Sequence, residues 1–187
     1  MTSTPLPKRL FDLVGATAGL LAFSPVMAVI TGAIVREDGW PVLFRQERLG
    51  RDRRPFSILK FRSMRDGRIT RVGRLLRATG LDELPQFVNI LRGDMSAVGP
   101  RPLTVEDVTR LGWTRPRYDF RWRVPPGLTG LAQVTEARSG RLSLALDRRY
   151  VARRSLALDV RLVAVSFAIN ALGKRRVRQL LARPRRA

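Results

Sequence analysis

The chain has 187 residues, a length that fits one domain with a substantial hydrophobic core. Its 36 Lys and Arg outnumber 15 Asp and Glu, and the net charge of +21 predicts an anionic partner: nucleic acid, an acidic membrane face or a phosphorylated substrate. The lack of cysteine and histidine excludes disulfides, thiol chemistry and a His-rich zinc site, and it leaves acid–base catalysis at neutral pH to carboxylates, Lys or Tyr.

The first predicted element is an apolar helix over residues 10–35, preceded by a polar start, residues 1–7, that we expect to be disordered. Asp12 is the only charged residue in this helix, which exceeds the roughly 20 residues needed to span a bilayer. Pro25 in its middle removes a helical hydrogen bond, and the Ser24 hydroxyl can supply one to the freed backbone. Two structures remain open: a kinked helix that crosses the membrane, and a broken helix that enters and leaves on the same side.

The charges that flank this segment favour the re-entrant form. Lys and Arg beside membrane segments stay on the cytoplasmic side, and here they stand on both flanks. They are Lys8 and Arg9 before the segment, and Arg36, Arg45, Arg48 and Arg51 after it. A buried core helix is excluded by the length and the lack of a polar face. A signal peptide is disfavoured because there is no clear small-residue cleavage site.

Residues 39–62 predict short strands joined by a glycine turn, and residues 65–77 predict a loop followed by a helical run. Lys60, near the end of the second strand, would ordinarily be a solvated surface charge. The arginines of the helical run would ordinarily form a solvated face as well. Among them we expect Arg77, five residues before Asp82, to face a phosphate.

A half-buried helix is predicted next from apolar residues at i, i+3, i+4 and i+7: Leu84, Phe87, Val88 and Leu91. Asp82 and Glu83 stand at the mouth of this helix, since Pro85 fits only near the first turn. There the free N–H groups and the helix dipole favour negative charge by about 0.3–1 kcal/mol. They would also favour an anion or a metal–phosphate complex. The ordinary role of such acids is a helix cap.

Arg101 lies between two prolines in the run Gly99-Pro100-Arg101-Pro102. Because prolines fix the backbone, the guanidinium loses less freedom when it binds a ligand. Guanidinium groups bind phosphate through two parallel hydrogen bonds. Arg101 is therefore a candidate phosphate ligand.

The rest of the chain predicts helices over residues 103–111, 142–154 and 156–172, and a small-residue loop leading into a strand over residues 128–134. The last helix is too short to span a bilayer, so we expect it to lie in the interface. A basic tail, residues 173–187, follows it. Beside anionic lipid each basic residue can add about 1 kcal/mol of binding free energy.

Aromatic and basic residues alternate between positions 113 and 124, among them Trp113, Arg121 and Trp122. Such residues either stack on nucleic-acid bases or anchor a protein at a membrane interface. The apolar segment upstream favours the interface. Asp147, within the predicted helix 142–154, would ordinarily form a helix ion pair.

Five motifs stand in order along the chain. They are Lys60-Phe61-Arg62-Ser63-Met64, Leu81-Asp82-Glu83-Leu84-Pro85-Gln86, Gly93-Asp94-Met95-Ser96-Ala97-Val98-Gly99-Pro100-Arg101-Pro102, Pro126-Gly127-Leu128-Thr129-Gly130-Leu131-Ala132-Gln133-Val134 and Leu146-Asp147-Arg148-Arg149-Tyr150-Val151. Together they resemble the bacterial sugar transferases, the monotopic phosphoglycosyl transferases that start glycan assembly on polyprenyl phosphate. The similarity runs from about Lys8 to Leu172.

The residues and the resemblance together imply a membrane-associated α+β fold that is mostly α-helical. Residues 8–38 would form a re-entrant membrane helix broken at Ser24 and Pro25. Residues 39–155 would form a compact catalytic domain with a few short strands and interfacial amphipathic helices, and residues 156–187 an interfacial helix and basic tail. The resemblance places such a protein on the cytoplasmic face of the bacterial inner membrane.

The resemblance implies transfer of a sugar-1-phosphate from a nucleotide sugar, with UDP as the expected nucleotide, to polyprenyl phosphate, through a phosphosugar–aspartate intermediate and with release of a nucleoside monophosphate. Asp82 would be the nucleophile, and Asp82 and Glu83 would hold Mg²⁺ (or Mn²⁺). The substrate-binding residues would be Lys60, Arg77, Arg101, Arg138 and Asp147. The expected partners are donor, lipid acceptor and anionic lipids, without nucleic acid; a homodimer is left open.

Three departures from the family pattern affect the expected substrate contacts. Only Arg65-Asp66-Gly67 remains of a longer acidic loop, Leu131 stands where the family has Trp, and Thr135-Glu136-Ala137-Arg138 replaces an Asn-Gly-Arg-like run. Two other classes stay open: a basic nucleic-acid-binding protein, suggested by charge alone, and a non-catalytic membrane scaffold, which would tolerate loss of Asp82 and Glu83.

Overall fold

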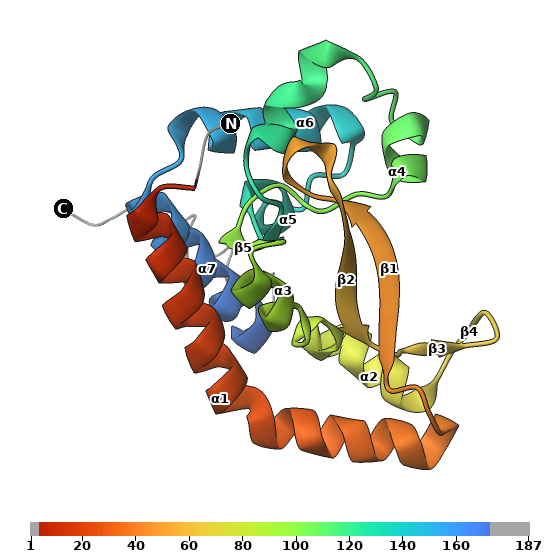
Figure 1. Ribbon diagram of the computed structural model, residues 1–187. Coiled ribbons are helices and arrows are strands. Elements are labelled where there is room, and N and C mark those ends of the chain that lie inside the picture. Colours follow the sequence, from red (N-terminus) through yellow and green to blue (C-terminus); the bar gives the residue numbers. More distant parts are fainter. Residues whose placement is uncertain (1–3, 173–187) are drawn as a thin grey trace.

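A computed structural model describes residues 4–172, so the predicted basic tail, residues 173–187, lies outside the described residues. One long bent helix, α1, borders a body of shorter helices and strands (Figure 1). Helices dominate this part of the chain, and its three sheets have two strands each. These elements confirm a mostly helical α+β fold.

The helix α1 (Leu6–Asp38) bends near its middle, where Pro25 has no backbone N–H to donate to the preceding turn (Figure 1). The Ser24 hydroxyl donates to the Leu21 carbonyl over 2.8 Å, the carbonyl that a residue with an N–H at position 25 would have satisfied. The helix nevertheless continues through this point, so the expected break is a bend. It also begins at Leu6, within the start that was expected to be disordered.

The first half of α1 is fixed to the body by two charged side chains. The Arg9 guanidinium donates to the carbonyls of Ile90 and Leu91, each over 2.7 Å. The buried Asp12 carboxylate accepts from the Ser96 hydroxyl at 3.1 Å and from the Ala97 N–H at 3.0 Å. These contacts hold α1 against α3 (Gln86–Arg92) and β5 (Ser96–Val98).

The other end of α1 is fixed to the same body. The Glu37 carboxylate accepts from the N–H groups of Arg71 and Val72, each over 2.8 Å, at the start of α2 (Arg71–Thr79). The Arg62 guanidinium donates to the Gly39 carbonyl over 2.7 Å. Both ends of the bent helix therefore rest on one structural unit.

The sheets are short and mostly antiparallel. β1 (Leu43–Leu49) and β2 (Pro55–Phe61) form a hairpin around the 3-10 turn η1 (Arg51–Arg53), as the sequence predicts. The loop expected after Met64 is a smaller hairpin of β3 (Met64–Arg65) and β4 (Arg68–Ile69). β5 pairs in parallel with β6 (Gly127–Thr129). β6 precedes the helical turn α5 (Leu131–Val134). The prediction of a loop leading into a strand over residues 128–134 is therefore wrong in its order and in its second element.

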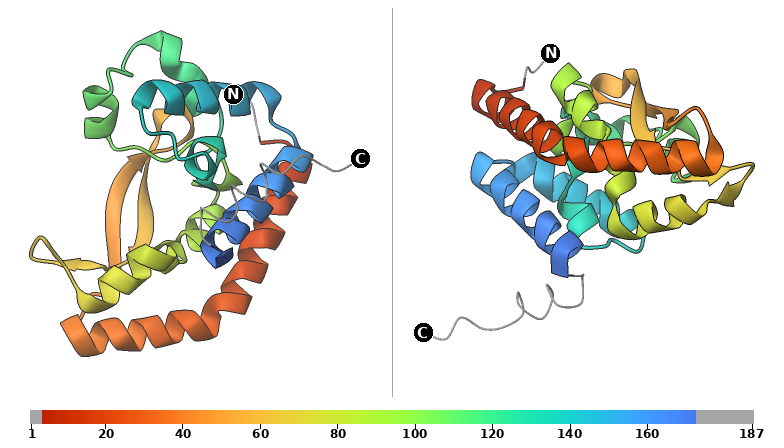
Figure 2. Two further views of the ribbon diagram at one scale, coloured as in Figure 1. Left: turned by 180° about the vertical axis from the view of Figure 1, so that it is seen from behind. Right: turned by 90° about the horizontal axis from the view of Figure 1, so that it is seen from below.

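The remaining helices lie close to their predicted positions: α4 (Val105–Arg110), α6 (Gly140–Arg153) and α7 (Leu156–Leu172). α7 runs beside the first half of α1 in both views of Figure 2. Lys8 joins the two helices, with its Nζ 2.8 Å from Asp12 Oδ1 and 3.1 Å from Asp159 Oδ2. Within residues 4–172, α1 is the one helix long and apolar enough to cross a membrane by length and composition.

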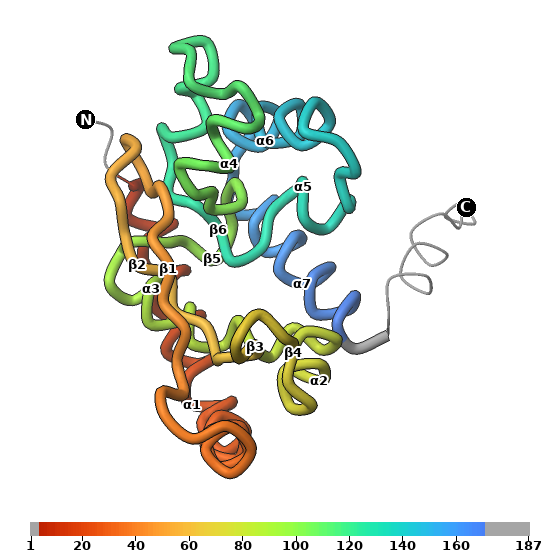
Figure 3. Tube along the Cα trace, turned by 90° about the vertical axis from the view of Figure 1, so that its right-hand side faces the viewer, coloured from red at the N-terminus to blue at the C-terminus, as the bar shows by residue number. Residues whose placement is uncertain are grey.

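Trp113, Arg121 and Trp122, expected at a membrane interface, are instead buried in the protein interior. Trp122, which lies in the 3-10 helix η3 (Pro116–Arg123), forms a buried cluster with Trp113, Leu103 and Val108. Figure 3 shows α4 and α6 at the end of the molecule opposite the C-terminal half of α1. Because these rings are covered by protein, they are available neither to lipid nor to nucleic-acid bases.

Candidate functional site

The two neighbouring acids lie in a tight turn between α2 and α3. Gly80 ends α2 with φ of 73°, a left-handed conformation that favours glycine, and the chain then enters the 3-10 turn η2 (Leu81–Glu83). Pro85 caps α3, and neither η2 nor α3 has a side-chain cap. The ordinary role of Asp82 and Glu83 as helix caps is therefore not the one that the structure shows.

Lys60 meets these acids from the neighbouring hairpin. Its Nζ lies 2.5 Å from Glu83 Oε1, and both side chains are partly exposed. The contact joins the last part of β2 to η2. Lys60, predicted from its motif, is thus a neighbour of the two acids that follow it by more than twenty positions in the sequence.

The environment of Asp82 is unusual for a carboxylate. Its partial burial raises the pKa of the Asp82 carboxyl, and neighbouring Glu83 raises this pKa further, while Lys60 and Arg77 act in the opposite direction. Arg77, in the last turn of α2, is exposed and close enough to act on Asp82 electrostatically. The structure therefore brings together four of the predicted site residues: Lys60, Arg77, Asp82 and Glu83.

Glu83 and Arg101 both line a cavity of about 500 Å³. Its walls come from Gly80, from residues 128–137, and from the far end of α7. Uncharged polar side chains contribute to the lining: Thr129, Gln133, Ser143, Ser166 and Asn170. A cavity lined by acidic, basic and uncharged polar groups suits a ligand that carries phosphate and hydroxyl groups.

The backbone around Arg101 is held by hydrogen bonds from other segments. The Gly127 N–H donates to the Pro100 carbonyl over 2.9 Å, and the Arg121 guanidinium donates to the Arg101 carbonyl. Arg121 is itself paired with Asp147, with 2.8 Å between Nε and Oδ2. Asp147 was predicted to bind substrate. It is instead buried beside Arg121, behind the Arg101 backbone, and it does not line the cavity.

Arg138 is exposed, next to Glu136 and Ala137, which line the cavity although Arg138 does not. Sequence reasoning did not single out Ser166 and Asn170. They stand four positions apart in a helix that is otherwise largely apolar, so they share one face of α7. That spacing is the sequence feature by which Ser166 and Asn170 could have been found. The corresponding feature for Arg121 is its position between two aromatic residues, which is also compatible with burial.

Asp82 and Glu83 are the two acids that the sequence predicts as metal ligands, and Glu136 also lines the cavity. Residues 4–172 contain no group of three or more acidic, histidine or cysteine ligands. This donor set suits Mg²⁺, which in enzymes is often bound by one or two carboxylates, with water and substrate phosphates completing its octahedron. Zinc-type sites need more protein ligands than this set offers.

The sequence model described as "Bacterial sugar transferase" matches residues 3–172. A UDP-glucose:undecaprenyl-phosphate glucose-1-phosphate transferase of Caulobacter vibrioides is 41% identical over 179 residues, which cover 84% of this chain and 67% of the relative. The Escherichia coli K12 protein of the same name is 39% identical over 179 residues, covering 84% of this chain and 39% of the relative.

A third relative, from Aeromonas hydrophila, is a UDP-N-acetylgalactosamine-undecaprenyl-phosphate N-acetylgalactosaminephosphotransferase. It is 39% identical over 175 residues, covering 83% of this chain and 41% of the relative. This chain thus spans about two fifths of the length of the Escherichia coli and Aeromonas proteins. Because the family match takes in the paired acids, Lys60 and the proline-flanked arginine, the chain belongs to the bacterial sugar transferase family.

Proposed function

We propose that this protein transfers a sugar-1-phosphate from a UDP-sugar to a polyprenyl phosphate and releases UMP. The observation that carries the proposal is the cavity that Glu83 and Arg101 share, with Lys60 2.5 Å from Glu83 and Asp82 beside it. Breaking a diphosphate requires a nucleophile and groups that neutralise phosphate charge. The relatives' names, which specify UDP-sugars and undecaprenyl phosphate, support the same substrates.

Asp82 is the nucleophile in this proposal. One of its carboxylate oxygens attacks the phosphorus next to the sugar, and the bond from that phosphorus to the bridging oxygen breaks. The bridging oxygen leaves with UMP, so the sugar phosphate is carried on Asp82 as an acyl phosphate. An oxygen of the lipid phosphate then attacks the same phosphorus and releases the Asp82 carboxylate. The product is a polyprenyl diphosphate sugar.

The neighbouring residues hold the charges in place. Lys60 fixes Glu83 through their ion pair and favours the ionised form of Asp82. Arg101, which lines the cavity, binds the phosphates there, and Arg77 acts electrostatically on Asp82 from the last turn of α2. A Mg²⁺ ion held by Asp82 and Glu83 would neutralise the diphosphate and favour departure of the UMP oxygen.

The bent helix α1 supports a re-entrant membrane segment on one side of the bilayer. Arg9 fixes its first half to α3 and Glu37 fixes its end to α2, so both ends belong to the same catalytic body. Apolar residues on the outside of α1, such as Leu21 and Val29, are largely exposed. An active site on the cytoplasmic face of the inner membrane would then meet a soluble donor and a lipid acceptor.

The test is UMP release by purified full-length protein in nanodiscs containing undecaprenyl phosphate and Mg²⁺, with UDP-glucose, UDP-galactose and UDP-N-acetylgalactosamine as donors. Asp82→Asn should abolish release and any acyl-phosphate adduct detected by mass spectrometry on the Asp82 peptide. Asp52→Asn is the matched control, because Asp52 is exposed and lies in η1 at a positive φ that Asn also tolerates. Turnover retained by Asp82→Asn would refute the nucleophile, and no UMP from any donor would refute the activity.

A further inference from the structure

Arg121 is an arginine buried in the interior behind the candidate site. It comes from η3, and its partner Asp147 comes from α6, 26 positions later. The Arg121 Nε lies 2.8 Å from Asp147 Oδ2, and both side chains are only 2% exposed. Burying an ion pair costs desolvation energy that hydrophobic residues of the same volume would not incur. The ion pair by itself is therefore expected to contribute little to the net stability of the fold.

The guanidinium of Arg121 has a second contact, which points toward the site. Its Nη2 donates to the backbone carbonyl of Arg101. The rings of Trp113 and Trp122 lie 5.5 and 5.7 Å from the guanidinium carbon and restrict its position. One planar group thus holds the Asp147 carboxylate with one arm and the Arg101 backbone with another.

The backbone that leads up to Arg101 is held by hydrogen bonds as well. The Tyr150 hydroxyl donates to the Val98 carbonyl over 2.9 Å, and the Gly127 N–H donates to the Pro100 carbonyl over 2.9 Å. The Arg101 side chain, in contrast, is exposed and lines the cavity. The structure thus combines a hydrogen-bonded backbone with an exposed Arg101 guanidinium that lines the cavity.

We propose that Arg121 is a positioning residue for phosphate binding, and that the Arg121–Asp147 pair fixes the Arg101 backbone so that its guanidinium meets the donor diphosphate. The proposal rests on the function proposed above. It also explains why arginine stands at position 121. A guanidinium presents several donors in a fixed fork, whereas a lysine ammonium could keep the Asp147 ion pair but could not hold both partners in this geometry.

The experiment compares Arg121→Lys and Asp147→Asn with the wild type in nanodiscs, each alone and combined with Arg101→Ala. The measured quantities are the affinity for UDP with Mg²⁺, kcat/KM for UMP release, and the thermal unfolding midpoint. Arg123→Gln is the matched control, since Arg123 is an exposed arginine of the same 3-10 helix. We expect Arg121→Lys to lower kcat/KM by about 10- to 100-fold, as misplaced binding groups do, and Arg123→Gln to have no effect.

The decisive comparison is the double variant. If Arg121 acts through Arg101, Arg121→Lys lowers UDP affinity and kcat/KM in the wild-type background but causes little further loss in Arg101→Ala. A purely structural role would give the same fold-loss in both backgrounds, and this additive result would overturn the proposal. Unchanged UDP affinity and kcat/KM in Arg121→Lys would overturn it too. If Arg121→Lys does not fold, Asp147→Asn provides the same comparison. A wild-type protein that neither binds UDP nor releases UMP would instead refute the proposed function.

Discussion

Lys60 and Glu83 form an ion pair of 2.5 Å that connects the β1–β2 hairpin to the turn bearing both acids. Lys60 is also among the causes that lower the pKa of Asp82, against the effect of burial. One ammonium group thus acts on both carboxylates. The hairpin is the element that places it there.

Replacing Lys60 with methionine should lower kcat/KM for UMP release by about 100- to 1,000-fold, because a charge that stabilises the reacting phosphates is lost. Lys60→Arg should retain part of the activity, since it keeps the charge but changes its geometry. Arg45→Met is the matched control, because Arg45 is an exposed cation on the same hairpin. Equal activity of Lys60→Met and Arg45→Met would show that the ion pair serves only the fold.

Asp82→Asn should unfold at the same temperature as the wild type or at a higher one, at pH 7 in EDTA. Burial raises the pKa of Asp82 above its ordinary value of 3.8. The folded state therefore binds more protons than the unfolded state, and stability falls as the pH rises from that value through the raised pKa. A neutral amide avoids this loss. Differential scanning calorimetry with Asp52→Asn as control measures it, and strong destabilisation of Asp82→Asn would contradict it.

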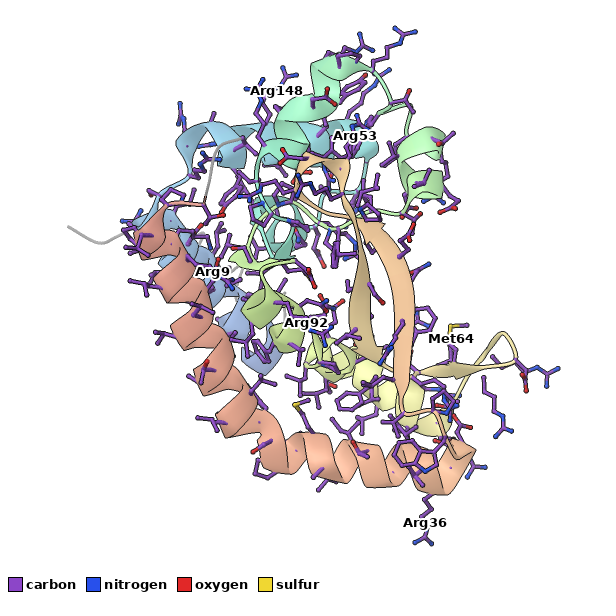
Figure 4. The ribbon with its side chains drawn as sticks, in the orientation of Figure 1. Arg9, Arg36, Arg53, Met64, Arg92 and Arg148 are labelled. Carbon is purple, nitrogen blue, oxygen red and sulfur yellow. The ribbon has the colours of Figure 1, made fainter. Side chains whose placement is uncertain are left out.

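Arg9 donates to two carbonyls at the end of α3, and in Figure 4 it points from α1 toward that helix, whereas Arg36 points away from the body. Arg9→Gln should lower the free energy of unfolding by about 1.5–3 kcal/mol, the usual contribution of hydrogen bonds to a charged group. Arg36→Gln should change it by less than about 0.5 kcal/mol, as exposed substitutions do. Denaturant unfolding in detergent compares the two variants, and equal effects would mean that the Arg9 contacts contribute nothing specific.

Local patterns predicted the elements well, because their causes lie within a few residues. The apolar spacing from Leu84 to Leu91 gives α3, which begins two residues later, and Pro25 with Ser24 gives the bend of α1. The helix-start pattern singled out Asp82 and Glu83, whereas Lys60 was predicted as a site residue only through the resemblance to a family. Spacing alone does not show that β2 ends beside η2.

Contacts between distant elements explain what the sequence did not predict. Lys8 and Arg9 were interpreted as charges that flank the membrane segment, yet they bind Asp12, Asp159 and the end of α3. Arg121 was predicted to lie at the membrane interface, but in the structure it is buried and paired with Asp147 of α6. A charge or an aromatic ring has the same appearance in sequence whether lipid or protein covers it. Whether such a residue contacts lipid or protein depends on tertiary packing, which the local sequence does not show.

The bend of α1 gives a prediction about topology. Since both ends of α1 rest on one body, reporters before and after the helix should lie on the same side of the membrane. The chain has no cysteine, so single cysteines at Thr2 and at Asp66, which is 93% exposed, can be labelled without background. In sealed inverted vesicles a membrane-impermeant maleimide should modify both.

The same labelling tests whether Pro25 maintains this topology. Pro25→Ala supplies the missing N–H to the Leu21 carbonyl and removes the ring that clashes with the preceding turn, so the helix can straighten. A straight apolar helix of 33 residues, about 50 Å long, is long enough to cross a bilayer. We expect part of the Pro25→Ala protein to expose Thr2→Cys and Asp66→Cys on opposite sides and to lose UMP release in the same proportion. Ser24→Ala, which removes one hydrogen bond but leaves the proline, should keep both reporters on one side. If Thr2→Cys and Asp66→Cys are labelled on opposite sides in protein that keeps Pro25 and Ser24, α1 crosses the membrane despite its bend.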